Sequence, residues 1–239
     1  MSVKRIDIRL PKETNGFPLN ENIQCVNQLF LRKLDKKCNL IINNTRMIYF
    51  NLYISTKSGN LHKYEIVSNF FDGYLYLDEA KVAEYERCDT NYSKKEFWLV
   101  RVFEYFLSIS ELFGWEKQTF IDAYNECMAC NINCGFFFKD KLFTSPNKEY
   151  SFGLYYELDI NIYNIYEVLY DKKKKEIARR KCYSRSGMIF YISWASWEKC
   201  NDKFYYKFNG PSKVFECTIN SLLSNEQYDL DKTDSQFFK

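Results

Sequence analysis

Hydrophobic and polar residues alternate in the first part of the chain in a way that predicts one helix among short strands. Residues 1–10 alternate charged and apolar side chains, as a strand does. Residues 20–36 place apolar side chains at helical spacing, and basic residues gather at their end, where the helix dipole favours cations. Residues 47–54 and 61–67 alternate again on either side of a Ser-Gly-Asn turn. We therefore expect an N-terminal helix with short strands around it.

The clearest pattern along the chain is a long apolar helix over residues 93–113. Ser93 and Glu96 have the spacing of a capping box, and Gly114 stands where a C-cap residue is preferred. One narrow polar stripe interrupts the apolar residues, at Arg101, Glu104, Ser108 and Glu111. A helix this apolar must be largely buried. Together with a second helix over residues 116–130, it predicts a buried helical hairpin in the middle of the molecule.

After Gly135 the pattern changes to short segments rich in Tyr, Phe and Ile, most of them separated by turn residues. These segments are 136–139, 151–159, 160–170, 177–184, 188–194, 203–208 and 214–219. Strands so closely spaced favour an antiparallel sheet. The sequence therefore predicts an α+β protein with an N-terminal helix and short strands, a central buried helical hairpin and a C-terminal antiparallel β-sheet. We expect a single domain over residues 1–239, with any subdomain boundary near residues 141–148.

Hydrophobic residues make up 46% of the chain, which is typical of a folded protein. Aromatic residues make up 19% of the chain, which is a large share. We interpret the aromatic residues as core residues of a chain with a compositional bias. No apolar run has the length of a signal peptide or a membrane span. We therefore expect a cytoplasmic protein with no membrane partner. Its nine cysteines are an odd number, and in that compartment we expect reduced thiols.

The sequence excludes several common kinds of enzyme. It contains one histidine, His62, so any Ser-His-Asp or Cys-His machinery would have to be built around that residue. Eight dispersed glycines form no loop that could bring several backbone amides onto a phosphate. We therefore predict no catalytic residue, no cofactor and no metal site. A non-enzymatic role is favoured, although an unfamiliar enzyme that uses carboxylates and tyrosines stays open.

Two groups of residues have chemistry that their pattern alone does not decide. Cys127, Cys130 and Cys134 share one helical face and could bind zinc or an iron–sulfur cluster, but no fourth ligand follows at a standard spacing. They fit equally as small core residues. Glu157 and Asp159 point to the same side of an expected strand, where paired carboxylates can bind Mg²⁺ or divide acid and base roles. The alternative for this pair is a solvated strand face beside lysines.

The most informative surface feature is the basic segment of residues 172–185, which contains Glu176 as its single acidic residue. It predicts a hairpin with a lysine tip and an arginine-bearing return strand, which could contact phosphates or an acidic protein surface. Two tryptophans follow, and Trp and Arg dominate protein interfaces. The predicted partner-binding residues are Lys173, Lys174, Arg179, Arg180, Lys181, Arg185, Trp194 and Trp197. The alternatives are a solubilising turn and core tryptophans.

Charge and motifs together favour recognition by a local surface. The net charge is +3 and is evenly distributed between the two halves, so no global field would steer the chain onto DNA or an anionic membrane. We expect a non-enzymatic protein-binding protein, such as a cytosolic inhibitor or a toxin-neutralising immunity protein that acts by surface complementarity. The alternative is a nucleic-acid-binding protein or metal-dependent nuclease that uses residues 172–185. The oligomeric state is not indicated.

Overall fold

The computed structural model describes residues 5–9, 23–34, 40–42, 44–47, 49–56, 63–186, 192–199, 202–208 and 214–224. The single histidine, His62, lies outside the described residues. Contacts divide the chain into two compact units, Met1–Cys134 and Gly135–Lys239. The single domain expected from the sequence stays a prediction.

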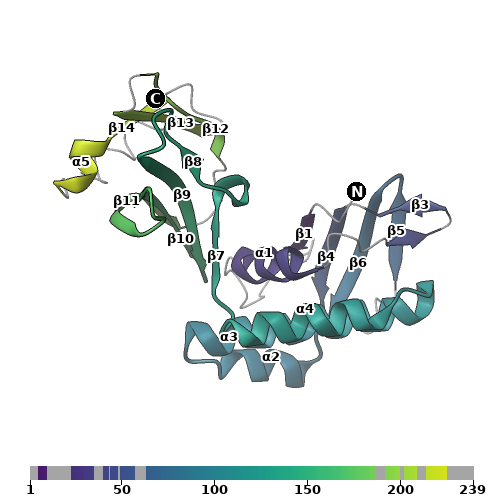
Figure 1. Ribbon diagram of the computed structural model, residues 1–239. Coiled ribbons are helices and arrows are strands. Elements are labelled where there is room, and N and C mark those ends of the chain that lie inside the picture. The colour runs from purple at the N-terminus through teal and green to yellow at the C-terminus, as the bar shows by residue number, and fades with distance from the viewer. Residues whose placement is uncertain are drawn as a thin grey trace. The chain divides into compact units, whose positions relative to one another are not determined.

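A four-stranded sheet forms one layer of the N-terminal unit (Figure 1). Its strands in spatial order are β1 (Arg5–Arg9), β4 (Tyr49–Ser55), β6 (Phe70–Tyr76) and β5 (Tyr64–Val67). The first three are parallel, and β5 pairs with β6 in the antiparallel sense. Between β1 and β4 the chain also forms a small hairpin of β2 (Ile41–Ile42) and β3 (Thr45–Arg46). The parallel pairing was not predicted, because alternation within a strand does not identify the neighbouring strand.

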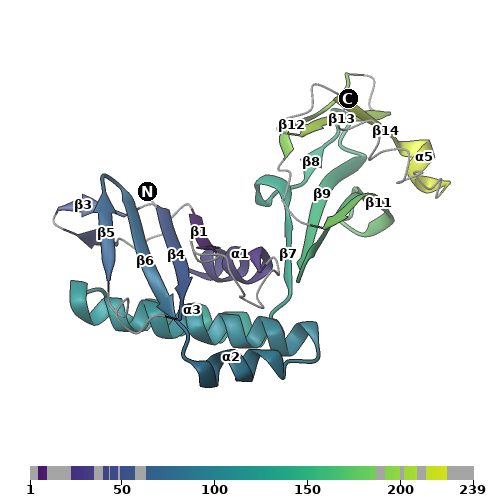
Figure 2. The same cartoon turned by 180° about the vertical axis from the view of Figure 1, so that it is seen from behind.

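Among the described residues of this unit, four helices accompany the sheet: α1 (Gln24–Lys33), α2 (Glu79–Glu86), α3 (Asn91–Phe113) and α4 (Lys117–Ala129). Both views show α3 and α4 side by side along the sheet (Figure 1, Figure 2). Phe106 of α3 joins the layers, since its ring centroid lies 5.3 Å from those of Phe50 in β4 and Phe120 in α4. It also lies 5.7 Å from that of Phe30 in α1. The predicted buried helical hairpin is therefore confirmed.

The long helix α3 begins earlier than predicted. Its N-cap is Thr90, and the Ser93 N–H donates to Thr90 Oγ1 at 3.0 Å while the Thr90 N–H donates to Ser93 Oγ at 3.2 Å. The prediction of a box from Ser93 to Glu96 was wrong, because Thr90 and Ser93 offer a reciprocal pair with the same spacing three residues earlier. Gly114 is confirmed at the C-cap with φ 67°, a left-handed conformation that glycine adopts without strain.

The described part of the C-terminal unit contains two sheets. The larger has the order β11–β10–β9–β7, with β8 paired to β9, and the smaller has the order β12–β13–β14. The larger sheet consists of β7 (Cys134–Phe137), β8 (Phe143–Thr144), β9 (Tyr150–Asp159), β10 (Ile162–Asp171) and β11 (Glu176–Ser186). The smaller consists of β12 (Ile192–Trp197), β13 (Lys203–Phe208) and β14 (Val214–Thr218). Two short helical segments accompany them, the 3₁₀ turn η2 (Phe138–Asp140) and α5 (Ile219–Leu223).

The two C-terminal sheets pack through aromatic inner faces. The ring centroids of Phe152 and Phe204 lie 4.0 Å apart, and those of Tyr183 and Phe208 lie 5.5 Å apart. Strand β10 pairs antiparallel with both β9 and β11, and β13 pairs antiparallel with both β12 and β14. The α+β prediction with a C-terminal antiparallel sheet is therefore confirmed.

Many of the described aromatic residues lie in the two cores. Among the described residues, the largest fully buried side chains are all aromatic, which supports their interpretation as core. No disulfide joins the cysteines of this part of the chain. The helices described here are all too short or too polar to cross a membrane.

Candidate partner-binding surface

The larger C-terminal sheet has one face turned away from the smaller sheet. Side chains alternate between the two faces of each strand, and the register of β9 and β10 places Tyr155 beside Tyr166. Tyr166 in turn lies beside Lys181 of β11, and Arg179 is two residues away on that strand. We name this surface the tyrosine–arginine face, formed by Tyr155, Glu157, Tyr166, Tyr170, Arg179 and Lys181.

Arg179 is held over the tyrosine rings of this face. Its guanidinium carbon lies 5.0 Å from the ring centroid of Tyr155 and 5.5 Å from that of Tyr166. Its Nε and Nη2 groups donate to the two carboxylate oxygens of Glu176 at 2.8 and 2.9 Å. These hydrogen bonds lower the pKa of Glu176, so the carboxylate stays ionised at neutral pH. Arg179 is therefore fixed by a bidentate ion pair and by two cation–π contacts.

Glu157 engages neutral donors of the same face. The Tyr166 hydroxyl donates to Glu157 Oε2 at 2.8 Å, and Asn164 Nδ2 donates to the same oxygen at 3.1 Å. Burial, followed by this hydrogen bond, raises the pKa of Tyr166 to about 12. Asp159, the other carboxylate of the predicted pair, accepts from the backbone N–H of Ile160. Glu157 is thus part of an ordered tyrosine network.

The turn between β10 and β11 extends this face. Asp171 Oδ1 accepts from the backbone N–H groups of Lys173 and Lys175 at 2.8 and 2.9 Å, which fixes the turn. Lys174 adopts a left-handed φ of 64°, and its ammonium donates to Ser151 Oγ at 2.7 Å. Lys172 pairs with Glu149 at 3.2 Å. The lysine tip is therefore an ordered, exposed cationic turn.

Arg180 points the other way, into the C-terminal unit. Its side chain is 5% exposed, and its Nε and Nη2 groups donate to the fully buried Glu167 at 2.9 and 2.6 Å. The Tyr206 hydroxyl donates to the other Glu167 oxygen at 2.9 Å. Burial raises the pKa of Glu167, and the attraction of Arg180 opposes that rise. Because its guanidinium is enclosed, Arg180 is not part of the surface considered below.

The two predicted tryptophans occupy different environments. Trp197 donates from Nε1 to the Phe143 carbonyl oxygen at 2.6 Å, and its ring packs edge-on against Phe204 at 5.5 Å. Trp194 is 46% exposed and pairs with Lys207 on the outer side of the smaller sheet. The two outer faces of a pair of packed sheets point in opposite directions. Trp194 therefore does not share a surface with Arg179.

The structure brings together only part of the predicted partner-binding set. Lys174, Arg179 and Lys181 lie on one face, with Lys173 in the adjoining turn. Arg185 is half-buried and lies opposite the buried Tyr163. Sequence reasoning missed the tyrosines of this face. Their signal was available in part, because Tyr166 and Tyr170 are four residues apart in β10, on the side opposite to the buried Ile165 and Leu169.

The cysteine cluster is part of the N-terminal core. Cys127 is fully buried, and burial raises the pKa of its thiol to about 12. Cys134 is also buried, with its pKa raised for the same reason. The Cys130 thiol donates to the carbonyl oxygen of Cys127 at 3.2 Å. Burial of this kind disfavours the thiolates that bind metals. Across the described ranges, no three His, Cys, Asp or Glu residues are arranged to hold a metal ion.

Comparisons with known proteins do not assign the chain to a group. No protein-family model matches it, and neither a curated protein nor a solved structure is significantly similar to it.

Proposed function

We propose that this chain is a non-enzymatic protein-binding protein and that its tyrosine–arginine face contacts an acidic surface of its partner. The observation that carries the proposal is the position of Arg179, held over Tyr155 and Tyr166 by its bidentate pair with Glu176. Tyr and Arg are the residue types that contribute most to protein interfaces. Here they are already ordered, so little side-chain entropy remains to be lost on binding.

The charge of this region suggests the chemistry of the partner. Lys181 lies 5.6 Å from the Tyr166 ring centroid, beside Arg179, and the lysine turn adjoins both. Within this region Glu157 and Glu176 are engaged by Tyr166 and Arg179. The turn therefore carries more exposed positive charge than negative charge. An acidic partner surface would be complementary, which favours fast association and correct orientation.

The same geometry argues against single-stranded nucleic acid as the partner. Proteins that bind single strands stack bases on open aromatic rings. On this face Arg179 already lies over the rings of Tyr155 and Tyr166, so a base would have to displace an ion-paired guanidinium. The lysine turn alone supports only the electrostatic part of such binding. Nucleic-acid binding is therefore the second candidate, and nuclease-sensitive capture would support it.

Within protein-binding proteins, we propose the inhibitor or toxin-neutralising class. Such proteins need a complementary surface and no catalytic group. The sequence predicts no catalytic or cofactor residue, and the tyrosine–arginine face offers hydrogen-bonded side chains without an open reactive group. This choice rests on general features of that class.

The proposal is tested by affinity capture from the native host with the tagged full chain and with a variant carrying Arg179→Ala and Tyr166→Ala. We expect one stoichiometric protein that is retained after nuclease treatment and is lost from the variant. Lys207→Ala, on the outer side of the smaller sheet, is the matched control and should keep the partner. Nuclease-sensitive capture, or capture that the double variant leaves unchanged, would contradict the proposal.

A further inference from the structure

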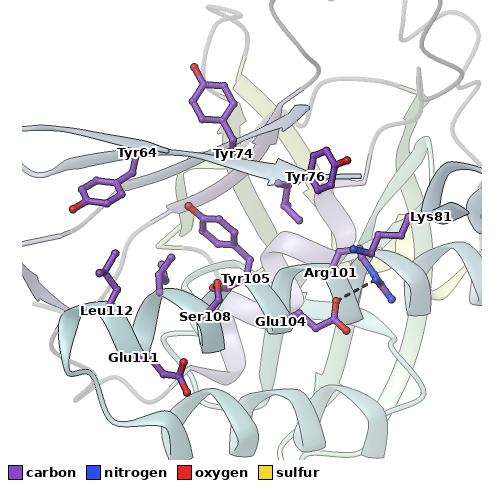
Figure 3. Close-up of a pocket in the computed structure, with 12 residues that line it drawn as sticks. Tyr64, Tyr74, Tyr76, Lys81, Arg101, Glu104, Tyr105, Ser108, Glu111 and Leu112 are labelled. Carbon is purple, nitrogen blue, oxygen red and sulfur yellow. Dashed lines mark hydrogen bonds and ion pairs between the residues drawn. The ribbon is translucent and has the colours of Figure 1, made fainter. Parts of the chain in front are cut away.

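A pocket of about 580 Å³ opens in the N-terminal unit between the four-stranded sheet and α3. Tyr64 of β5 and Tyr76 of β6 line its sheet side, and Tyr105 rises from α3 between them (Figure 3). A volume of this size is typical of pockets for small organic ligands. The tyrosine–arginine face belongs to the other unit, so this pocket is a separate feature.

The polar stripe of α3 forms one wall of this pocket. Arg101, Glu104, Ser108 and Glu111 all line it. Figure 3 shows Ser108 and Glu104 on the helix below Tyr105, with Arg101 paired to Glu104 toward α2. A polar stripe on an otherwise apolar helix ordinarily faces open solvent. Here it faces a hollow, where its groups converge on one volume.

The middle of the pocket is apolar and aromatic. Leu75 and Ile109 are buried in its lining, and the Tyr105 ring lies above Gly73. A Cβ at Gly73 would meet the Tyr105 hydroxyl oxygen at 1.8 Å, so glycine is required for this close approach. Burial raises the pKa of Tyr105, and among the described residues no hydrogen bond engages its hydroxyl. Tyr105 therefore offers a ligand a neutral hydroxyl donor, and its ring forms part of the pocket wall.

The two cations of the pocket lie at one end. Lys81 of α2 and Arg101 of α3 are neighbours there (Figure 3). The Arg101 side chain is only 12% exposed, whereas its partner Glu104, at 3.2 Å, is 54% exposed and well solvated. Arg101 Nε is buried with no acceptor in the described part of the chain. At the other end, Glu111 pairs with Lys117, which shields its charge. The two ends of the pocket therefore differ in charge. At the Arg101 end, a positively charged side chain lacks a full set of hydrogen-bond acceptors.

We propose that this pocket binds a small aromatic molecule that carries one anionic group. The anion lies at the Lys81–Arg101 end, where, after a small rotation of the guanidinium, its oxygens would supply the acceptor that Arg101 Nε lacks. The rings lie along Tyr105, between the tyrosines of the sheet and the apolar residues of α3. A buried cation that lacks a full set of acceptors and an apolar volume beside it are complementary to such a ligand.

The test uses two fluorescent probes with the same ring system, anilinonaphthalene sulfonate and the uncharged phenylnaphthylamine. We expect the sulfonate to bind the full-length protein saturably at one molecule per chain, more tightly than the uncharged probe. Arg101→Gln should weaken the sulfonate by about 10-fold or more, the effect of one charge-assisted contact, and should leave the uncharged probe unchanged. Ser108→Trp should fill the hollow and abolish the binding of both probes.

Two further variants serve as controls for charge and for folding. Arg87→Gln, an exposed arginine of α2's C-cap outside the pocket, should change neither probe. Lys81→Gln, on the surface, should fold normally and still weaken the sulfonate if Arg101→Gln proves unstable. Equal affinity for the two probes, or sulfonate binding that survives Ser108→Trp in a variant with an unchanged circular dichroism spectrum, would overturn the proposal.

Discussion

Tyrosine and arginine come together in both units, but in opposite states. On the tyrosine–arginine face, Nε and Nη2 of Arg179 donate to the two carboxylate oxygens of Glu176, and the Tyr166 hydroxyl donates to Glu157. In the pocket, Arg101 pairs with a solvated Glu104 and lies over the Phe97 ring, but its Nε has no acceptor among the described residues, which also offer no partner to the Tyr105 hydroxyl. A satisfied network on an open sheet suits a large partner that adds contacts at its edges. Unsatisfied groups around a hollow suit a small ligand that supplies what is missing.

The largest expected effect is a difference in stability between variants of two adjacent arginines. Arg180→Met should lower the free energy of unfolding of the C-terminal unit by about 3–5 kcal/mol, because it leaves Glu167 buried without its partner. Arg179→Met removes an exposed pair and should cost at most about 1 kcal/mol. Urea unfolding monitored by circular dichroism measures both.

A second change checks the cause of the loss at Arg180. Adding Glu167→Leu to Arg180→Met removes the buried charge itself and should recover part of the stability. If the two arginine variants lose equal stability, the assignment of Arg180 to the interior and Arg179 to the surface is wrong.

The next effect compares two glycines that each lie under a tyrosine hydroxyl. A Cβ would meet the hydroxyl oxygen at 1.8 Å both at Gly73, under Tyr105, and at Gly135, under Tyr155. Tyr105 is enclosed, so Gly73→Ala should cost about 1–3 kcal/mol and reduce probe binding. Tyr155 lies at the surface of its sheet, where it can shift at the expense of its contact with Arg179, so Gly135→Ala should cost less. Thermal unfolding compares the two variants.

Tyr105→Phe tests whether the hydroxyl is the obstacle at Gly73. It removes the closest atom, although Phe71 Cε1 at 2.8 Å also limits the space. In the background of Tyr105→Phe, the cost of Gly73→Ala should therefore fall but not vanish. An unchanged cost would mean that the Tyr105 hydroxyl does not lie over Gly73.

A smaller effect concerns the titration of the tyrosine–arginine face. Burial and the bond to Glu157 raise the pKa of Tyr166 to about 12. A raised pKa favours the protonated folded state, so this contribution is present below pH about 10 and is lost as the pH rises toward 12. Glu157→Gln should lower the pKa of Tyr166, as followed by NMR of its ring. A pKa that stays near 12 in this variant would assign the shift to burial alone.

Sequence alone predicted what depends on local pattern. The strands around Tyr155 and Tyr166 and the stripe from Arg101 to Glu111 follow from spacing, and the structure places them accordingly. The inward turn of Arg180 did not follow, because its partner Glu167 is 13 residues away and is brought opposite only by the register of β10 and β11. The same limit hid the pocket. Its walls come from β5, β6, α2 and α3, and β6 and α2 were not predicted.

The smallest expected effect concerns Trp194, the residue that the sequence grouped with Arg179 and that the structure separates from it. Trp194 is 46% exposed on the outer side of the smaller sheet, so Trp194→Ala should change the free energy of unfolding by no more than about 0.5 kcal/mol. It should also leave partner capture intact, because the tyrosine–arginine face points the opposite way. Loss of capture with Trp194→Ala, at unchanged stability, would move the contact surface to the smaller sheet. If Trp194→Ala keeps the partner and Arg179→Ala loses it, the contact surface is restricted to Arg179 and the tyrosines beneath it.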